Sequence, residues 1–183
     1  MFRGVFMGTL FLCLAACSSQ KIIQPDAKTG YYPARTTAAV VSSVPFDIDA
    51  RRALVLVPDN DFVKGEVANM GYFGQIITAE ELEKAIVQQG LTDKVPAITD
   101  QIGLSNAAKN YKPFLWLHFK RRGSGTDTYS QFILTDPLSL QDLLVVETHL
   151  DFMWTGVNDQ YNWYPMFNAL IDYIRANSKT YRR

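Results

Sequence analysis

The sequence contains very little cysteine and no excess of charge of either sign. Its 183 residues include 2 cysteines, Cys13 and Cys17, and 18 Lys and Arg residues balance 18 Asp and Glu residues. Two cysteines this close together in the chain cannot staple a domain. Electrostatic binding of nucleic acid needs clustered positive charge, which a balanced chain does not supply. The sequence therefore excludes a disulfide-stapled fold and predicts no nucleic-acid partner.

Histidine is also scarce, and the common catalytic and nucleotide-binding motifs do not occur. The chain has 2 histidines, His118 and His149, which excludes a histidine-rich site. No segment matches the Gly-x-Ser-x-Gly motif of hydrolases, a P-loop or the Gly-x-Gly-x-x-Gly fingerprint. From motifs alone we therefore predict no catalytic residue and no cofactor.

Apolar residues, by contrast, are plentiful. Hydrophobic residues make up 48% of the chain and charged residues 20%. This is enough apolar surface to build a core, and it excludes a disordered chain. The length corresponds to about one domain.

The first sixteen residues have the parts of an export signal. Met1-Phe2-Arg3 supplies a short positive start, and an almost unbroken apolar run follows from Gly4 to Leu14. Small residues come next. The run is too short to span a bilayer as a permanent helix, so residues 1–16 are predicted to be a signal peptide.

The end of this segment, Leu14-Ala15-Ala16-Cys17, resembles the lipobox of bacterial lipoproteins. In that family the cysteine is acylated and cleavage occurs just before it. The resemblance implies that Cys17 is lipidated and attaches the protein to a membrane. A single myristoyl-length chain binds reversibly, whereas two or three chains give an almost permanent anchor. The alternative is an ordinary cleaved signal that happens to contain a cysteine.

Ser18 directly follows the predicted anchor. A serine at this position resembles the sorting signal of Gram-negative lipoproteins that are sent to the outer membrane. The resemblance implies a position in the cell outer membrane, facing the periplasm. Once residues 1–16 are removed and Cys17 is acylated, the mature chain has no free thiol. A cysteine nucleophile, which is common among cell-wall hydrolases, is thereby excluded.

Residues 17–49 are predicted to be the lipidated cysteine and a flexible tether. No helical period is sustained, and three prolines interrupt the segment: Pro25, Pro33 and Pro45. A flexible stretch of about 30 residues has an end-to-end distance of roughly 30 Å, enough to lift a domain clear of the lipid headgroups. Two apolar pairs favour docking of part of the segment on the domain: Tyr31-Tyr32 and Val40-Val41.

Residues 50–183 are predicted to form one globular domain. Apolar runs and alternation predict five strands, at Ala53–Val57, Tyr72–Ile77, Phe114–Arg122, Thr128–Thr135 and Asp142–Trp154. Helical spacing predicts four helices, at Asp59–Met70, Thr78–Gly90, Thr99–Tyr111 and Tyr164–Asn177. The expected fold class is α/β (α+β). We expect a single mixed sheet of about five strands with helices packed on it, in which a C-terminal antiparallel meander is followed by a helix.

This order of elements is similar to the amino-terminal domain of the Tol-system propeller protein and to the α/β domain of curli-secretion-type lipoproteins. The points of likeness are Leu54-Val55-Leu56-Val57-Pro58, Gly71-Tyr72-Phe73 and the turn Leu134-Thr135-Asp136-Pro137. The resemblance covers about residues 50–180 and concerns the fold, which by itself carries no function.

One strand carries a candidate catalytic or metal-binding set, Glu147, His149 and Asp151. Alternate residues of a strand share a face, and carboxylates and imidazole suit acid–base chemistry or metal binding. His118, on a neighbouring strand, is a further metal candidate. The alternative is a solvated face, because a half-exposed antiparallel strand is polar on its wet side. Three residues spaced at about 6.6–6.8 Å also cannot close around one ion without a bend.

A second candidate set is aromatic: Trp154, Tyr161, Trp163 and Tyr164. Aromatic rings with amide side chains between them suit recognition of a sugar or a peptide. The alternative is that the same rings pack the last helix onto the sheet.

The leading hypothesis is an outer-membrane-anchored periplasmic lipoprotein that acts as a non-enzymatic binding or scaffolding module. Its partners would be the membrane, through the N-terminal lipid, and a periplasmic protein or glycan. The competing hypothesis is a glycan- or metal-handling envelope enzyme that uses Glu147, His149 and Asp151.

Overall fold

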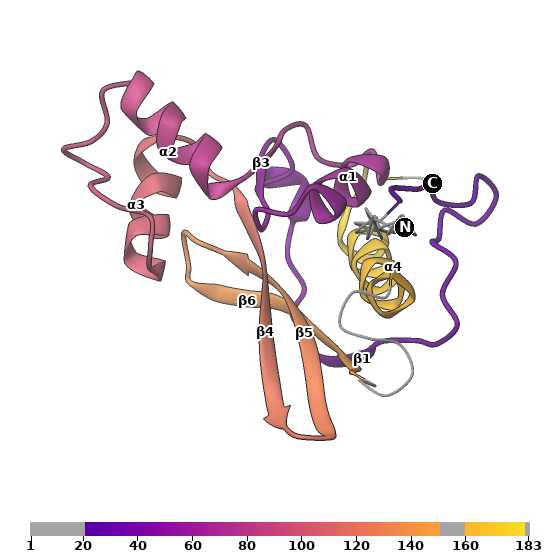
Figure 1. Ribbon diagram of the computed structural model, residues 1–183. Helices are drawn as coiled ribbons and strands as arrows, with labels where there is room; N and C mark the ends of the chain where they lie inside the picture. Colours follow the sequence, from indigo (N-terminus) through magenta and orange to yellow (C-terminus); the bar gives the residue numbers. More distant parts are fainter. Residues whose placement is uncertain (1–20, 151–159, 182–183) are drawn as a thin grey trace, which may run out of the picture.

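The computed structural model describes residues 21–150 and 160–181. In this part of the chain, six strands form one mixed sheet in the order β1-β6-β5-β4-β2-β3 (Figure 1). The strands are β1 (Ala39–Ser43), β2 (Val55–Leu56), β3 (Ile76–Ile77), β4 (Leu115–Ser124), β5 (Asp127–Asp136) and β6 (Gln141–His149). Strand β2 runs parallel to β3 and β4, and the other pairs are antiparallel.

Four α-helices of the described chain pack on this sheet: α1 (Asp61–Asn69), α2 (Ala79–Gln88), α3 (Gln101–Asn110) and α4 (Gln160–Asn177). Helices α1 and α4 share one core cluster with the sheet, and α2 and α3 share a second one. The predicted fold class is confirmed, because the structure is an open mixed sheet with helices packed on it. Along the chain, the antiparallel meander β4-β5-β6 is followed by α4, as expected. Strand β1 brings the number of strands to six, where about five were expected.

Strand β2 lies between the two clusters, as its wholly apolar run predicts. Residues Leu54 to Val57 are all buried. Leu54 and Leu56 point into the cluster with α2 and α3, whereas Val55 and Val57 point into the cluster with α1 and α4. Alternate residues of a strand face opposite sides, so a strand covered on both faces must be apolar at every position.

Helix α2 begins and ends as its caps predict. The Thr78 hydroxyl accepts a hydrogen bond from the Glu81 amide at 3.4 Å, and the Glu81 carboxylate accepts one from the Thr78 amide at 2.8 Å. This reciprocal pair is a capping box, which satisfies amides that have no partner within the helix. After the helix, Gly90 adopts a φ of 64°, the left-handed conformation expected at the stop.

Other boundaries differ from the predictions. The N-caps of α1 and α3 are Asn60 and Asp100, because their side chains accept hydrogen bonds from the amides of the first turn. The strand predicted over 72–77 is reduced to Ile76–Ile77. Helix α4 begins at Gln160 rather than at 164, so Pro165 lies inside the helix and not in its first turn.

Strand β6 alternates as predicted from Leu144 to His149, whereas Leu143 and Leu144 are both buried. Leu144, Val146 and Thr148 are buried on the side of α4, whereas Val145, Glu147 and His149 lie on the other face. The strand ends at His149. Residues 151–159, which include Asp151 and Trp154, lie outside the described residues.

The segment before residue 50 is packed on the domain along its described length, from 21 to 49. Residues Ala39–Ser43 pair antiparallel with β6, Tyr32 is 2% exposed and Ile48 is fully buried. For these residues the prediction of a flexible tether is wrong. The docking expected of Tyr31-Tyr32 is confirmed, and Val40-Val41 form part of the sheet. The domain boundary near residue 50 stays a prediction.

Asp49 joins this N-terminal segment to the end of α4. Its carboxylate accepts hydrogen bonds from the hydroxyls of Tyr72 (2.8 Å), Ser178 (2.7 Å) and Thr180 (2.9 Å), and from the amide of Lys179 (2.8 Å). The Ser178 hydroxyl, with the other donors, holds the pKa of Asp49 well below its ordinary value of 3.8. The ionised carboxylate therefore ties together three parts of the chain that are distant in sequence.

We expect Asp49→Asn to lower the free energy of unfolding by about 1–3 kcal/mol at neutral pH, because hydrogen bonds to a charged group are lost. Because the pKa of Asp49 is lower in the folded than in the unfolded state, its ionised carboxylate stabilises the fold at pH values above the unfolded-state pKa. This stabilisation is lost as the pH falls toward the folded-state pKa. Denaturant unfolding should therefore show the difference shrinking below about pH 4. Asp47→Asn is the control, since Asp47 is exposed and makes no capping hydrogen bond. A difference that stays constant with pH would contradict the role of the charge.

Candidate functional site

Glu147 and His149, the strand residues predicted as a catalytic or metal-binding set, are engaged by their neighbours. The Glu147 carboxylate accepts hydrogen bonds from the Arg122 guanidinium at 2.9 and 3.1 Å and from the Gln131 amide at 3.1 Å. Arg122 lowers the pKa of Glu147 and favours its charged form. His149 lies 3.0 Å from the Thr126 carbonyl oxygen. Glu147 is thus an ion-pair partner on the sheet face.

His118 does not approach His149. Its ring stacks on Trp116 at 3.8 Å between centroids, and its Nε2 lies 3.1 Å from the Thr135 hydroxyl. Burial lowers its pKa. The β-sheet register places the two histidines four residues along the strands and two strands across, a separation of roughly 16 Å. Among the described residues, no three His, Cys, Asp or Glu side chains are grouped closely enough to hold a metal ion.

The two described rings of the aromatic set contact the core. Tyr164 is 2% exposed and stacks on Tyr32, with ring centroids 5.3 Å apart and an interplanar angle of 4°. Trp163 is half-buried and meets Phe119 edge-on at 4.5 Å. The core-packing alternative therefore describes Tyr164. Trp154 and the side chain of Tyr161 lie outside the described part of the structure.

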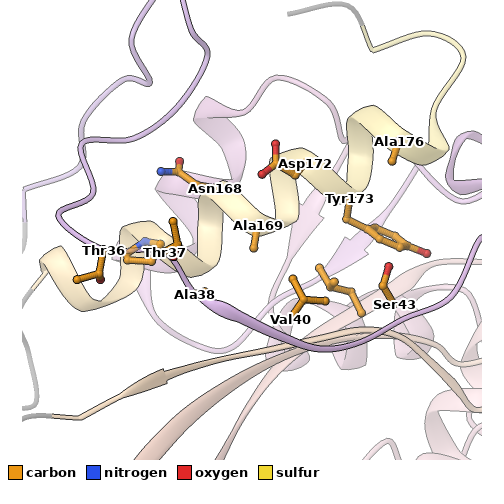
Figure 2. A pocket seen from close by; sticks show the side chains of 12 residues that line it. Thr36, Thr37, Ala38, Val40, Ser43, Asn168, Ala169, Asp172, Tyr173 and Ala176 are labelled. Carbon is orange, nitrogen blue, oxygen red and sulfur yellow. The ribbon is translucent and has the colours of Figure 1, made fainter.

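The candidate site that the structure itself offers is a groove of about 300 Å³ between β1 and α4. Figure 2 shows Ala169 and Tyr173 pointing from α4 toward β1, and Val40 and Ser43 pointing from β1 toward the helix. Small side chains from both sides line part of the groove. Its lining comprises Thr36, Thr37, Ala38, Val40, Ser43, Leu144, Pro165, Asn168, Ala169, Asp172, Tyr173 and Ala176.

Strand β1 gives this groove a free backbone edge. It is the terminal strand of the described sheet and pairs on one side with β6, with an irregular register between Val40 and Ser42. All five of its residues are exposed, and Val40 and Val41 are 57% and 54% exposed. Edge strands are commonly guarded by charged residues or proline, and Ala-Val-Val-Ser-Ser contains neither. Among the described residues, no strand pairs with the second edge of β1.

The walls of the groove are held in place by hydrogen bonds. The Asn168 side chain accepts from the Tyr32 amide at 2.7 Å and donates to the Tyr32 carbonyl at 2.9 Å. At the other end, the Tyr173 hydroxyl donates to the Val44 carbonyl at 2.7 Å, and burial raises the pKa of Tyr173 to about 12. Asp172 accepts a hydrogen bond from the Tyr31 hydroxyl. The groove thus has fixed walls with a carboxylate at its rim.

The sequence carried only a faint signal of this site. Val40-Val41 stood out as apolar, and Ala169 and Ala176 are small residues two helical turns apart on α4. Neither observation shows that β1 lies beside α4, because that contact joins segments more than 120 residues apart.

Comparison with known proteins finds no matching family model and no matching curated protein. Among solved structures, the chain is similar to the LpoB C-terminal domain from Salmonella enterica, with 14% identity over 56% of this chain and 84% of that one, and a TM-score of 0.38. It is also similar to the LpoB C-terminal domain from Escherichia coli, with 14% identity over 55% and 85% of the two chains and a TM-score of 0.37. Similarity at this level does not extend to function. The resemblance to the Tol-system and curli-secretion domains stays a prediction.

We expect Asn168→Ala to lower the free energy of unfolding by about 1–3 kcal/mol, because both backbone groups of Tyr32 lose their partner in a part-buried site. Thermal or denaturant unfolding of the mature domain measures this loss. Asn110→Ala is the matched control, since Asn110 is exposed and bonds only within α3. Equal stability of the two variants would contradict this role of the Asn168 hydrogen bonds.

Proposed function

We propose that this chain is a lipoprotein of the outer membrane that is anchored at Cys17 and binds a periplasmic protein without catalysing a reaction. The observation that carries the anchor is the sequence: a positive start, an apolar run and the ending Leu14-Ala15-Ala16-Cys17, followed by Ser18. The lipid would hold the protein on the membrane without a spanning helix. Within the described residues, no helix is long and apolar enough to cross a bilayer.

The groove between β1 and α4 is the binding surface we assign to the partner. An extended peptide can add a strand to an open sheet edge, where main-chain hydrogen bonds supply affinity and pockets for alternate side chains supply specificity. The open edge of β1 and the adjacent groove meet both requirements. At about 300 Å³ the groove has the size of the smallest ligand pockets, which suits one or two side chains. We therefore propose an extended segment of a periplasmic protein as the ligand.

The competing proposal is an envelope enzyme that uses Glu147, His149 and Asp151. The contacts of Glu147 with Arg122 and Gln131 favour a structural role for this carboxylate. A triple alanine variant at the three positions is therefore expected to restore every envelope phenotype of a deletion strain. Loss of complementation, with normal amounts of folded protein, would support the enzyme instead.

For the anchor, we expect Cys17→Ala to abolish acyl labelling and to release the protein from membranes, because no lipid would then hold it. Metabolic labelling with a fatty-acid probe and membrane fractionation measure the two effects. Cys13→Ala is the matched control, since Cys13 lies inside the predicted signal peptide. Continued labelling of the Cys17→Ala protein would contradict the assignment.

For the partner, we expect Val40→Lys to reduce recovery of a crosslinked envelope protein about tenfold, the effect of losing about 1.4 kcal/mol of binding free energy. Val87→Lys is the matched control, because Val87 is a similarly exposed valine on α2, outside the groove. Crosslinking in intact cells followed by pull-down of each variant makes the comparison. Equal recovery by both variants would exclude the groove as the binding surface.

A further inference from the structure

The first described residues form a strap, residues 21–32, that is held on the domain by side-chain clamps. The backbone amide of Ile23 donates a hydrogen bond to the Glu66 carboxylate at 3.0 Å. The backbone carbonyl of Ile23 accepts one from the side-chain amide of Asn69 at 2.7 Å. Gln24 adds a hydrogen bond of 2.6 Å to Asn69. Glu66 is fully buried, and its Oε1 atom accepts the hydrogen bond from the Ile23 amide. Both backbone groups of Ile23 are therefore held by α1.

Gly65 leaves room for the Ile22 side chain of the strap against α1. A Cβ atom at this position would lie 2.5 Å from Cδ1 of Ile22, so the glycine leaves a notch in which the Ile22 side chain sits. A glycine inside a helix costs about 1 kcal/mol relative to alanine. At Gly65, the close approach of the strap gives the residue a structural role.

The other end of the strap is held by α4. Asn168 binds both backbone groups of Tyr32, in the same two-sided manner as α1 binds Ile23. The Arg175 guanidinium lies 4.4 Å from the centroid of the Tyr31 ring and donates to the Thr29 carbonyl at 2.6 Å. The strap thus crosses from α1 to α4 and is fixed at both ends.

The length of chain before the strap then limits how far the domain can lie from its anchor. Three residues, Ser18 to Gln20, separate Cys17 from Lys21. Even fully extended, the chain spans at most about 14 Å from Cys17 to Lys21 and about 21 Å from Cys17 to the clamped Ile23. A free tether of about 30 residues would have allowed roughly 100 Å when extended.

We infer that the side of the domain formed by α1 and the strap faces the lipid headgroups at close range. This inference rests on the proposed lipidation of Cys17. Ile22 and Lys21, both exposed, are the described residues nearest the anchor in sequence. The turn between β4 and β5 lies at the opposite end of the molecule from α1 (Figure 1), so the long hairpin is directed away from the membrane.

Fluorescence quenching at two positions tests this orientation. The acylated full-length protein is inserted in phosphatidylcholine–phosphatidylglycerol vesicles that carry a nitroxide on the lipid headgroup. Because Cys17 is blocked by lipid and Cys13 is removed, one introduced cysteine can be labelled uniquely with bimane. Ala68→Cys reports from α1 beside the clamp, and Ser124→Cys reports from the hairpin end; both positions are exposed. We expect quenching at 68 to be at least about twofold stronger than at 124.

The decisive variant lengthens the connection without touching the folded domain. A Gly/Ser insertion of about twelve residues between Gln20 and Lys21 adds up to roughly 40 Å of reach. We expect it to remove the difference between positions 68 and 124. Equal quenching at both positions in the unextended protein, or unchanged quenching after the insertion, would overturn the inference.

Docking of the strap is tested separately by trypsin. The double variant Gly65→Leu with Asn69→Ala fills the notch and removes one clamp, so cleavage at Lys28 should rise about tenfold as the open strap becomes more populated. Cleavage at Lys94, an exposed lysine outside the strap, is the internal control and should not change. Unchanged cleavage at Lys28 would also overturn the inference.

Flotation with the vesicles separates this inference from the proposed function. A full-length protein that carries no acyl chain and does not float contradicts the anchor at Cys17. A protein that floats but shows no dependence of quenching on position contradicts only the orientation.

Discussion

The packing of α4 against the sheet is the contact on which the other features of this protein depend. Four side chains of its apolar stripe are fully buried in the core: Phe167, Leu170, Ile171 and Ile174. With that face fixed, the remaining faces of the helix are available for other tasks. Asn168 clamps the strap, Ala169 forms a wall of the groove, and the residues after the helix bind Asp49. One buried hydrophobic face thus positions the N-terminal segment, the groove and residues 178–180 together.

The docked strap changes the expected relation between domain and membrane. Prolines and small polar residues are typical of a linker, and local composition predicts flexibility well when a segment has nothing to bind. Here the segment packs apolar side chains such as Ile23, Tyr31 and Tyr32 on the core. Its backbone is also bound by Glu66, Asn69 and Asn168 from helices distant in sequence. Such clamps leave no periodic signal in the segment they hold. Composition therefore identified the segment but not its state.

On the polar face of β6, too, the local sequence pattern predicts which residues share a face but not which residues lie opposite them. Alternation along the strand placed Glu147 and His149 on one face, and the structure agrees. Whether these residues act as ligands or as ion-pair partners depends on the side chains opposite them, and the register sets Gln131 beside Glu147 and Tyr129 beside His149. The same register keeps His118 away from His149. A single sequence does not specify a register between strands, because many alignments satisfy the same alternation.

The sequence by itself determined the elements whose signals are local. These are the buried run of β2, the capping box of α2, the alternation of β6 and the stripe of α4. The anchor at Cys17 is also a local signal, and it stays a prediction. The tertiary structure alone decided the sixth strand, the strap and the groove, together with the neighbours of the polar strand residues. The physical reason is that the first group depends on the spacing of residues along one segment. The second depends on which distant segments meet, and that is set by the packing of the whole core.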